Sequence, residues 1–396
     1  MWNALKTKVS ERYPEMVKWR RHLHQNPELS YRESATSGFI ADTLKSFGLD
    51  VATGIGGYGV TALIRGGRPG PTVALRADMD ALPIQDGKAC SYASRVPGVM
   101  HACGHDGHTA ALLGTGKLLA EMSEQLSGNV LLIFQPAEEV APGGAQAMIR
   151  DGVLEGVDEI YGVHLWTPLP SGIVATCSGP MMASVDDFDL EIRGKGGHGG
   201  MPHETVDSLV VGAHLVVNLQ TVISRNLNPI KPGVVTVAAL QSGNSYNVIP
   251  DKAYLKGTVR TFDPITRKLA RERIEAIISG TCSMFGAEHT LNYKVGYPPV
   301  VNSPAETERL QNVLRGVLGT EAVREAEMNM PAEDFSYYLE RVPGCFLFVG
   351  AGGEGAEYPH HHPMFDLREE AIGQAALVLA SAAISRLNGS AASKAI

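Results

Sequence analysis

The sequence predicts an α/β protein with a mostly parallel sheet and helices on both faces, interrupted by an inserted α+β domain of ferredoxin-like type. Short β-branched runs alternate with helical stretches over residues 1–181 and again over 298–396, as in sheets built from strand–helix–strand units. Between 182 and 297 the strands instead alternate apolar and polar residues, as they do when one face of a sheet is exposed. We therefore expect two domains, one formed by 1–181 plus 298–396 and the other by 182–297.

In the first domain, the first sixty or so residues look helical. After them, short apolar runs that are typical of strands alternate with stretches that are typical of helices. The expected strands are 72–76, 129–134, 159–165 and 345–350, and the expected helices are 109–119, 143–152, 304–318 and 368–387.

In the second domain, the order strand–helix–strand–strand–helix–strand is the ferredoxin-like pattern, a one-sided sheet with two helices. The expected elements are strand 184–194, helix 207–224, strands 233–240 and 252–262, helix 264–279 and strand 289–297.

The composition is globular and mildly acidic. The 396 residues carry a net charge of -8, so nucleic-acid binding is not expected. No window approaches the roughly 18 uninterrupted apolar residues of a membrane helix, and we expect no membrane association. The cysteines are odd in number and widely spread, which predicts free thiols in a reducing cytoplasm. They are Cys90, Cys103, Cys177, Cys282 and Cys345.

Ligand-type side chains follow three of the predicted strands. Strand 72–76 leads into Asp78, strand 129–134 leads into a pair of glutamates, and strand 159–165 carries His164 near its end. Because loops converge at the carboxyl ends of parallel strands, we expect these groups at one edge of the sheet.

The segment MHACGHDGH (100–108) is the densest cluster of such residues. Cys103 and His105 alternate by two, so both can point the same way from an extended loop. Cysteine sulfur, histidine nitrogen and carboxylate oxygen are the ligands that Zn²⁺ and related ions prefer. The alternative is a His-rich turn that caps the helix starting near Thr109. The convergence of four segments favours a metal site.

Glu138 and Glu139 adjoin in the loop after strand 129–134. Two neighbouring buried carboxylates repel each other unless a cation compensates them. Glu139 could therefore bind a metal while Glu138 takes a proton from water. The alternative is a solvated acidic loop.

A further ligand is expected from three consecutive histidines, His360, His361 and His362, which precede Pro363. At most one or two of them can face a site, and the residue pattern alone does not select among them.

Nine motifs then occur in order along nearly the whole chain: HLHQNPELSYRE, RADMDALP, HACGHDGHTA, FQPAEE, GVHLW, GKGGHGGMPH, NVIPD, AEDFSYY and HHHPMFD. Through them the chain resembles the zinc peptidase and aminoacylase family, in the branch of hippurate hydrolase and the plant indoleacetyl-amino-acid hydrolases. The resemblance implies a catalytic domain, 1–181 plus 298–396, and an inserted lid, 182–297, that also mediates dimers.

The resemblance implies a site with two divalent ions bridged by Cys103, and Zn²⁺ is the expected ion, with Mn²⁺, Co²⁺ and Ni²⁺ also compatible. Glu138 would be the general base, and Asp78 would orient the site. Other family members have His and Asp where this chain has Arg76 and Cys103, and a bridging thiolate is softer and sensitive to oxidation. The implied metal ligands are Cys103, His105, Glu139, His164 and His362.

Three residues of the lid complete the predicted site. His198 matches a family histidine that reaches the neighbouring subunit's site and stabilises the oxyanion. Asn247 matches a substrate contact, and Arg260 is a candidate clamp for a carboxylate because its guanidinium suits that group. His198 and Asn247 could instead be plain turn residues, since each lies in a Gly- or Pro-rich loop.

The expected reaction is hydrolysis of N-acyl amino acids, with acetyl, benzoyl or similar acyl groups, to a carboxylic acid and a free amino acid. The expected enzyme is a cytoplasmic homodimer. The same ligand set suits a metallo-carboxypeptidase or a deacetylase of another acylated metabolite. A non-catalytic metal- or redox-sensing protein built on Cys103 is the remaining alternative, and the presence of a base, Glu138, favours the enzyme.

Overall fold

The computed structural model describes residues 2–392, and the chain divides into two compact units. The first consists of Met1–Met181, Val301–Glu327 and Asp334–Ile396, and the second of Met182–Val300 with Met328–Glu333. The second unit thus contains the expected lid range 182–297. It also takes in a short later segment that the sequence pattern did not indicate.

The first unit is built on an eight-stranded sheet with strand order β1-β2-β4-β3-β5-β16-β6-β15. Its centre, from β4 through β3 and β5 to β16, is parallel. The strands are β1 (Asp50–Ile55), β2 (Gly59–Arg65), β3 (Arg68–Asp78), β4 (Ser127–Gln135), β5 (Glu159–Pro170), β6 (Val174–Thr176), β15 (Val323–Glu325) and β16 (Gly344–Gly352). Two short strands, β7 (Gly179–Met182) and β14 (Val300–Asn302), lie outside this sheet.

The prediction of helix through about residue 60 is wrong beyond residue 49, because β1 and β2 form an antiparallel hairpin there. Both strands are rich in β-branched residues, and their turn contains Gly56 and Gly57, each with positive φ. Glycine adopts that backbone without steric cost.

Helices cover both faces of this sheet, as the sequence predicts. The apolar core on one face joins Leu132 of β4 and Leu347 of β16 to the long helices α1, α3 and α9. Side chains alternate along a strand, so Phe346 points to the opposite face, where its ring packs against Phe335, the residue before α8. Helix α8 in turn contacts α4. The helices are α1 (Trp2–Gln25), α2 (Ser34–Ser46), α3 (His105–Glu121), α4 (Gly144–Arg150), α7 (Pro304–Leu318), α8 (Ser336–Leu339) and α9 (Glu370–Ala392).

One stretch of α9, Glu370–Asn388, is long and apolar enough to cross a membrane by length and composition, with a mean hydropathy of 1.2. However, 72% of it is buried inside the fold. It contacts β3, β4, β5 and β16, which is the packing of a central core helix.

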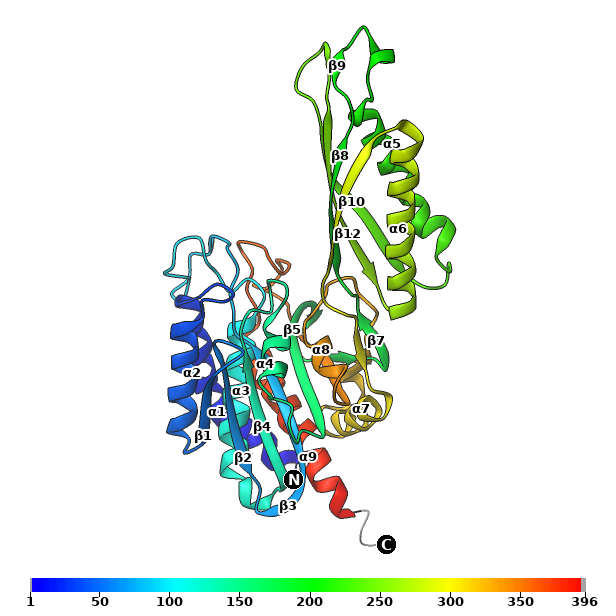
Figure 1. The fold of residues 1–396 in the computed structure, drawn as a ribbon. Helices are drawn as coiled ribbons and strands as arrows, with labels where there is room; N and C mark the ends of the chain where they lie inside the picture. The colour runs from blue at the N-terminus through cyan, green and yellow to red at the C-terminus, as the bar shows by residue number, and fades with distance from the viewer. Residues whose placement is uncertain (1, 393–396) are drawn as a thin grey trace. The chain divides into compact units, whose positions relative to one another are not determined.

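The second unit has a four-stranded antiparallel sheet in the order β10-β12-β8-β13. Helices α5 and α6 pack against each other on one side of it (Figure 1). This is the predicted ferredoxin-like arrangement. Its elements are β8 (Asp186–Arg193), α5 (Ser208–Thr221), β10 (Gly233–Gln241), β12 (Lys252–Thr261), α6 (Pro264–Phe285) and β13 (Glu288–Val295).

Candidate metal centre and active site

The first ligand group forms where the loop before α3 meets the middle of β5, at His164. Gly104 has φ 92, a left-handed conformation that suits glycine, and it separates Cys103 from His105, the first residue of α3. Cys103 Sγ lies 3.5 Å from His164 Nε2. Ligand atoms of Cys103, His105 and His164 all lie within 4.8 Å of one another.

A second ligand group shares the same sulfur. Ligand atoms of Cys103, Glu139 and His361 lie within 4.8 Å of one another, as do those of His105, Glu138 and Glu139. His361 Nε2 lies 3.4 Å from Glu139 Oε1. Because Cys103 belongs to two groups, the geometry suits a thiolate that bridges two cations.

The residues present fit divalent metal ions. His105 Nε2 and Glu139 Oε1 are buried without a hydrogen-bond partner among the described residues, and they lie 3.8 Å apart. Leaving such atoms unsatisfied costs roughly 1–3 kcal/mol each. A cation would satisfy both, and a set of sulfur, nitrogen and carboxylate oxygen is one that zinc and related ions accept.

Asp80 holds both of these atoms in place. Its carboxylate Oδ1 lies 3.2 Å from His105 Nδ1, which leaves Nε2 to face the other ligands. Its Oδ2 accepts hydrogen bonds from Glu139 N at 3.0 Å and from Ser30 Oγ at 2.6 Å. The sequence pattern contained a signal for this role, because Asp78 and Asp80 are two apart at a strand end and so point the same way.

His108 belongs to the same cluster but is already fully paired. Its Nδ1 donates to Asp78 Oδ1 at 2.6 Å, and its Nε2 accepts from Leu165 N at 2.8 Å. Both ring nitrogens are therefore occupied within the protein. Asp78, the predicted orienting carboxylate, thus holds the ring of His108, and its Oδ2 lies 3.8 Å from His105 Nε2.

The electrostatics of the cluster favour a bound cation. Burial lowers the pKa of His105, but Asp78 and Asp80 outweigh it and raise that pKa to about 10. Burial and the nearby Glu139 hold the pKa of the Cys103 thiol well above its usual range. A buried site with this excess of carboxylates is stabilised by positive charge, and a metal ion would convert the thiol to the thiolate.

The structure corrects the predicted ligand His362. The ring of His362 stacks on Tyr358 with centroids 4.6 Å apart, and its Nδ1 accepts from Met364 N at 3.0 Å. His361 is the histidine that reaches the cluster. Its φ of 64 is unusual for a residue other than glycine, and such strain concentrates at functional sites.

His360 faces a different neighbour. Its Nε2 accepts from Thr167 N at 3.3 Å, and its ring stacks on Trp166 with centroids 4.7 Å apart. Burial lowers the pKa of His360 to about 3, so it is a neutral ring that packs beside His164, with centroids 5.1 Å apart.

The three predicted lid residues all lie in the second unit. His198, on the short strand β9 (Gly197–His198), is exposed, and its Nδ1 accepts from Gly200 N at 3.0 Å. This bond leaves Nε2 as the donor of the neutral ring. Asn247 is its neighbour, because β9 pairs with β11 (Val248–Ile249).

Arg260 lies apart from these two residues. It is near the far end of β12, eight residues from Lys252, which corresponds to roughly 26 Å of extended strand. Asn247 lies beyond the Lys252 end of that strand. One small ligand therefore cannot contact both Asn247 and Arg260 of the same subunit.

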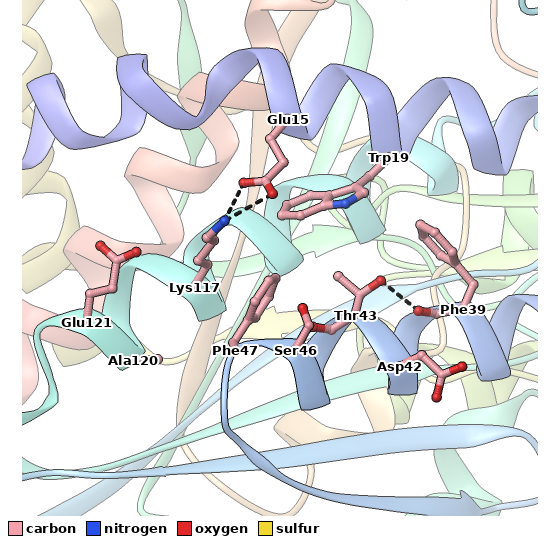
Figure 2. A pocket seen from close by; sticks show the side chains of 10 residues that line it. All are labelled: Glu15, Trp19, Phe39, Asp42, Thr43, Ser46, Phe47, Lys117, Ala120 and Glu121. Atoms are coloured by element: carbon pink, nitrogen blue, oxygen red, sulfur yellow. Dashed lines mark hydrogen bonds and ion pairs between the residues drawn. The ribbon is translucent and has the colours of Figure 1, made fainter.

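A surface pocket of about 650 Å³ lies elsewhere in the first unit, lined by α1, α2 and α3 (Figure 2). Lys117 donates to both carboxylate oxygens of Glu15, at 2.7 and 3.0 Å, and its Nζ lies 5.4 Å from the centre of the Phe47 ring. No predicted site residue lines this pocket, so it is separate from the metal ligands.

Comparison with known proteins agrees with this geometry. Residues 74–385 match Peptidase family M20/M25/M40. The chain is 50% identical over 374 residues to "Putative amidohydrolase YhaA" of Bacillus subtilis (strain 168), covering 94% of each chain. It is 41% identical over 385 residues to thermostable carboxypeptidase 2 of Saccharolobus solfataricus, covering 96% of this chain and 97% of that one.

Two further similarities bear on the site. The chain is 45% identical over 298 residues to the N-acyl-L-amino acid amidohydrolase of Geobacillus stearothermophilus, covering 75% of this chain and 80% of that one. The crystal structure of the Bacillus subtilis YXEP protein, a dinuclear metal-binding peptidase of the M20 family, matches with a TM-score of 0.84 and 35% identity, covering 96% of this chain and 99% of that one. The chain therefore belongs to the M20/M25/M40 peptidase family, and it is a metal-dependent amidohydrolase.

Proposed function

We propose that this protein hydrolyses N-acyl amino acids to a carboxylic acid and a free amino acid. Its metal ligands would be Cys103, His105, Glu139, His164 and His361. The observation that carries the proposal is the position of Glu138, a buried carboxylate next to the ligand Glu139. Its ligand atom lies within 4.8 Å of those of His105 and Glu139. The Geobacillus relative named as an N-acyl-L-amino acid amidohydrolase supports this substrate class.

Two divalent ions, Zn²⁺ by preference, would supply Lewis acidity toward the amide carbonyl and would activate a water. Glu138 takes the proton of the attacking water and returns it to the leaving amide nitrogen. Burial keeps bulk water from competing for that proton. Asp80 and Asp78 keep His105 and the neighbouring His108 in fixed orientations throughout.

The lid contributes three proposed substrate contacts. His198 would donate from Nε2 to the developing oxyanion, and Asn247 beside it would contact the substrate. Because Arg260 lies at the other end of β12, we propose that it meets substrate together with His198 and Asn247 only when two subunits contribute to one site.

A homodimer through the lid is therefore part of the proposal. Its support is the apolar outer surface of α5, where Leu209 and Val210 are each 41% exposed and Val217 is 67% exposed. Val210 and Val217 lie two helical turns apart and so share one face. Apolar side chains grouped in this way are typical of a subunit interface.

We also propose that the enzyme works in the cytoplasm. Each of its five cysteines is a free thiol, and a bridging thiolate needs a reducing environment because oxidation would destroy it.

The proposed function is tested by amino-acid release from N-acetyl, N-benzoyl and indoleacetyl amino acids, beside unblocked dipeptides and peptides with a free carboxyl terminus. Metal-stripped protein is assayed next to samples resupplied with Zn²⁺, Mn²⁺, Co²⁺ or Ni²⁺. We expect release from N-acyl amino acids that is lost on chelation and restored by at least one ion. Faster cleavage of peptides than of every N-acyl amino acid would instead identify a carboxypeptidase.

A further inference from the structure

The turn that carries Glu138 and Glu139 has a strained backbone. Ala137, the residue before Glu138, has φ 53 and is fully buried. The left-handed region is unfavourable for a residue with a Cβ, so surrounding contacts must hold it there. Whatever fixes Ala137 also fixes the direction in which Glu138 leaves the chain.

Two buried carboxylates hold this turn, one on each side of Glu138. Glu33 Oε1 accepts a hydrogen bond from Ala137 N at 2.8 Å. Asp80 Oδ2 accepts one from Glu139 N at 3.0 Å. The backbone N–H groups that flank Glu138 are therefore both bonded to side chains from other segments.

Glu33 is placed unusually for this contact. It occupies the residue just before α2, where a side chain commonly caps its own helix, yet it makes no such bond. Glu28 accepts instead from the first N–H groups of α2, those of Ala35 at 3.1 Å and Thr36 at 2.7 Å. The side chain of Glu33 is thus available to reach Ala137.

The burial of Glu33 is unfavourable on its own. The residue is fully buried, and its Oε2 has no hydrogen-bond partner among the described residues. Burying a carboxylate costs free energy. We therefore expect one only where it makes a hydrogen bond that an apolar side chain could not make. Here that bond is the one to Ala137.

We propose that Glu33 is a positioning residue of the hydrolytic site, which holds the Ala137 turn so that Glu138 and Glu139 are correctly aimed. The inference rests on the proposed roles of Glu138 as base and Glu139 as ligand. Glu33 touches neither substrate nor metal, and it acts only through the backbone of the turn.

The test compares three variants of the full-length protein: Glu33→Ala, Glu33→Gln and Glu28→Ala. The readouts are kcat and KM, taken separately, and the Zn²⁺ dissociation constant from competition with a chromophoric chelator. We expect Glu33→Ala to lower kcat and weaken Zn²⁺ binding roughly 10–100-fold each, with KM changed by less than about threefold. Glu33→Gln retains an acceptor oxygen and should restore both values to within about threefold of wild type.

Glu28→Ala is the matched control, because it removes bonds to α2 without touching the turn. It should lower thermal stability while leaving kcat and Zn²⁺ affinity within about threefold of wild type. Wild-type values in Glu33→Ala would overturn the proposal, as would equal losses in Glu28→Ala. Since Zn²⁺ affinity is measured without substrate, it decides on Glu33 even where no N-acyl amino acid is hydrolysed.

Discussion

Arg76 Nη1 donates a hydrogen bond to Asp78 Oδ2 at 2.7 Å, with both side chains fully buried. Arg76 Nη2 also donates to Asp334 Oδ1 at 2.9 Å, and its Nε donates to Gln135 Oε1 at 2.9 Å. One guanidinium therefore connects the carboxylate that orients His108 to a second buried carboxylate. A buried network of charged side chains, centred on Arg76, therefore holds Asp78 in place beside the candidate metal ligands.

Arg76→Ala should destabilise the first unit strongly. The change leaves Asp78 and Asp334 buried without their cation, and breaking a buried pair in this way typically costs 3–5 kcal/mol. The free energy of unfolding from urea titration measures the loss, and Arg76→Lys should lose less because it keeps the charge. A loss below about 1 kcal/mol would show that the network does not depend on Arg76.

His361 and His362 should respond differently to substitution. His361→Ala should weaken metal binding roughly 10–100-fold because it removes a ligand atom next to Glu139. His362→Ala should leave metal affinity nearly unchanged, since its ring is engaged with Tyr358 and Met364. Chelator competition on both variants measures the difference, and the reverse order of losses would restore His362 as the ligand.

The free energy of unfolding should depend on pH because folding raises the pKa of Glu33. Burial, with a further contribution from Asp80, raises the pKa of Glu33 from 4.5 to about 7. The folded state then holds the proton more tightly than the unfolded chain does. This contribution to stability is fully present below pH 4.5 and is lost as the pH rises through about 7.

Glu33→Gln removes this titration. Its free energy of unfolding relative to wild type should therefore increase between pH 4.5 and pH 8, by at most about 3 kcal/mol. Urea titrations of both proteins at the two pH values, with chelator present, measure the change. A difference that is the same at both pH values would mean that Glu33 ionises normally in the folded protein.

Val217→Asp should disrupt the proposed dimer. A carboxylate at this exposed position of α5 would have to lose its water in an apolar interface, which is unfavourable. Light scattering after size-exclusion chromatography should show a monomer. Ile265→Asp, at a 76% exposed position of α6, is the control that should leave the mass unchanged. A monomeric wild type would contradict the proposed interface.

Much of the fold could be predicted from the sequence, because strand and helix patterns differ in period. The hairpin of β1 and β2 was missed, since its strands follow two long helices without a strong alternation. The cluster around Cys103 and His105 could be predicted because ligand-type residues lie on or just after neighbouring strands of one sheet. The choice of His361 could not, because a left-handed turn at that residue decides which ring reaches Glu139.

The positioning carboxylates were missed for a related reason. Asp80 and Glu33 both stand in motifs that the sequence displays, yet their partners are backbone N–H groups at Glu139 and Ala137. A sequence shows no pattern for a bond between a side chain and a backbone that lies 59 or 104 residues away. The fold was therefore needed to show that Asp80 and Glu33 hold the turn of Glu138 and Glu139 in place.

The most direct test of the account measures metal content and turnover together in Glu138→Ala. We expect two ions per subunit, as in wild type, with turnover of the best N-acyl amino acid lowered by roughly 10²–10⁴-fold, because the proton acceptor is removed and the ligands remain. Near wild-type turnover with two ions bound would contradict the assignment of Glu138 as the base. Loss of an ion along with activity would instead make Glu138 a ligand.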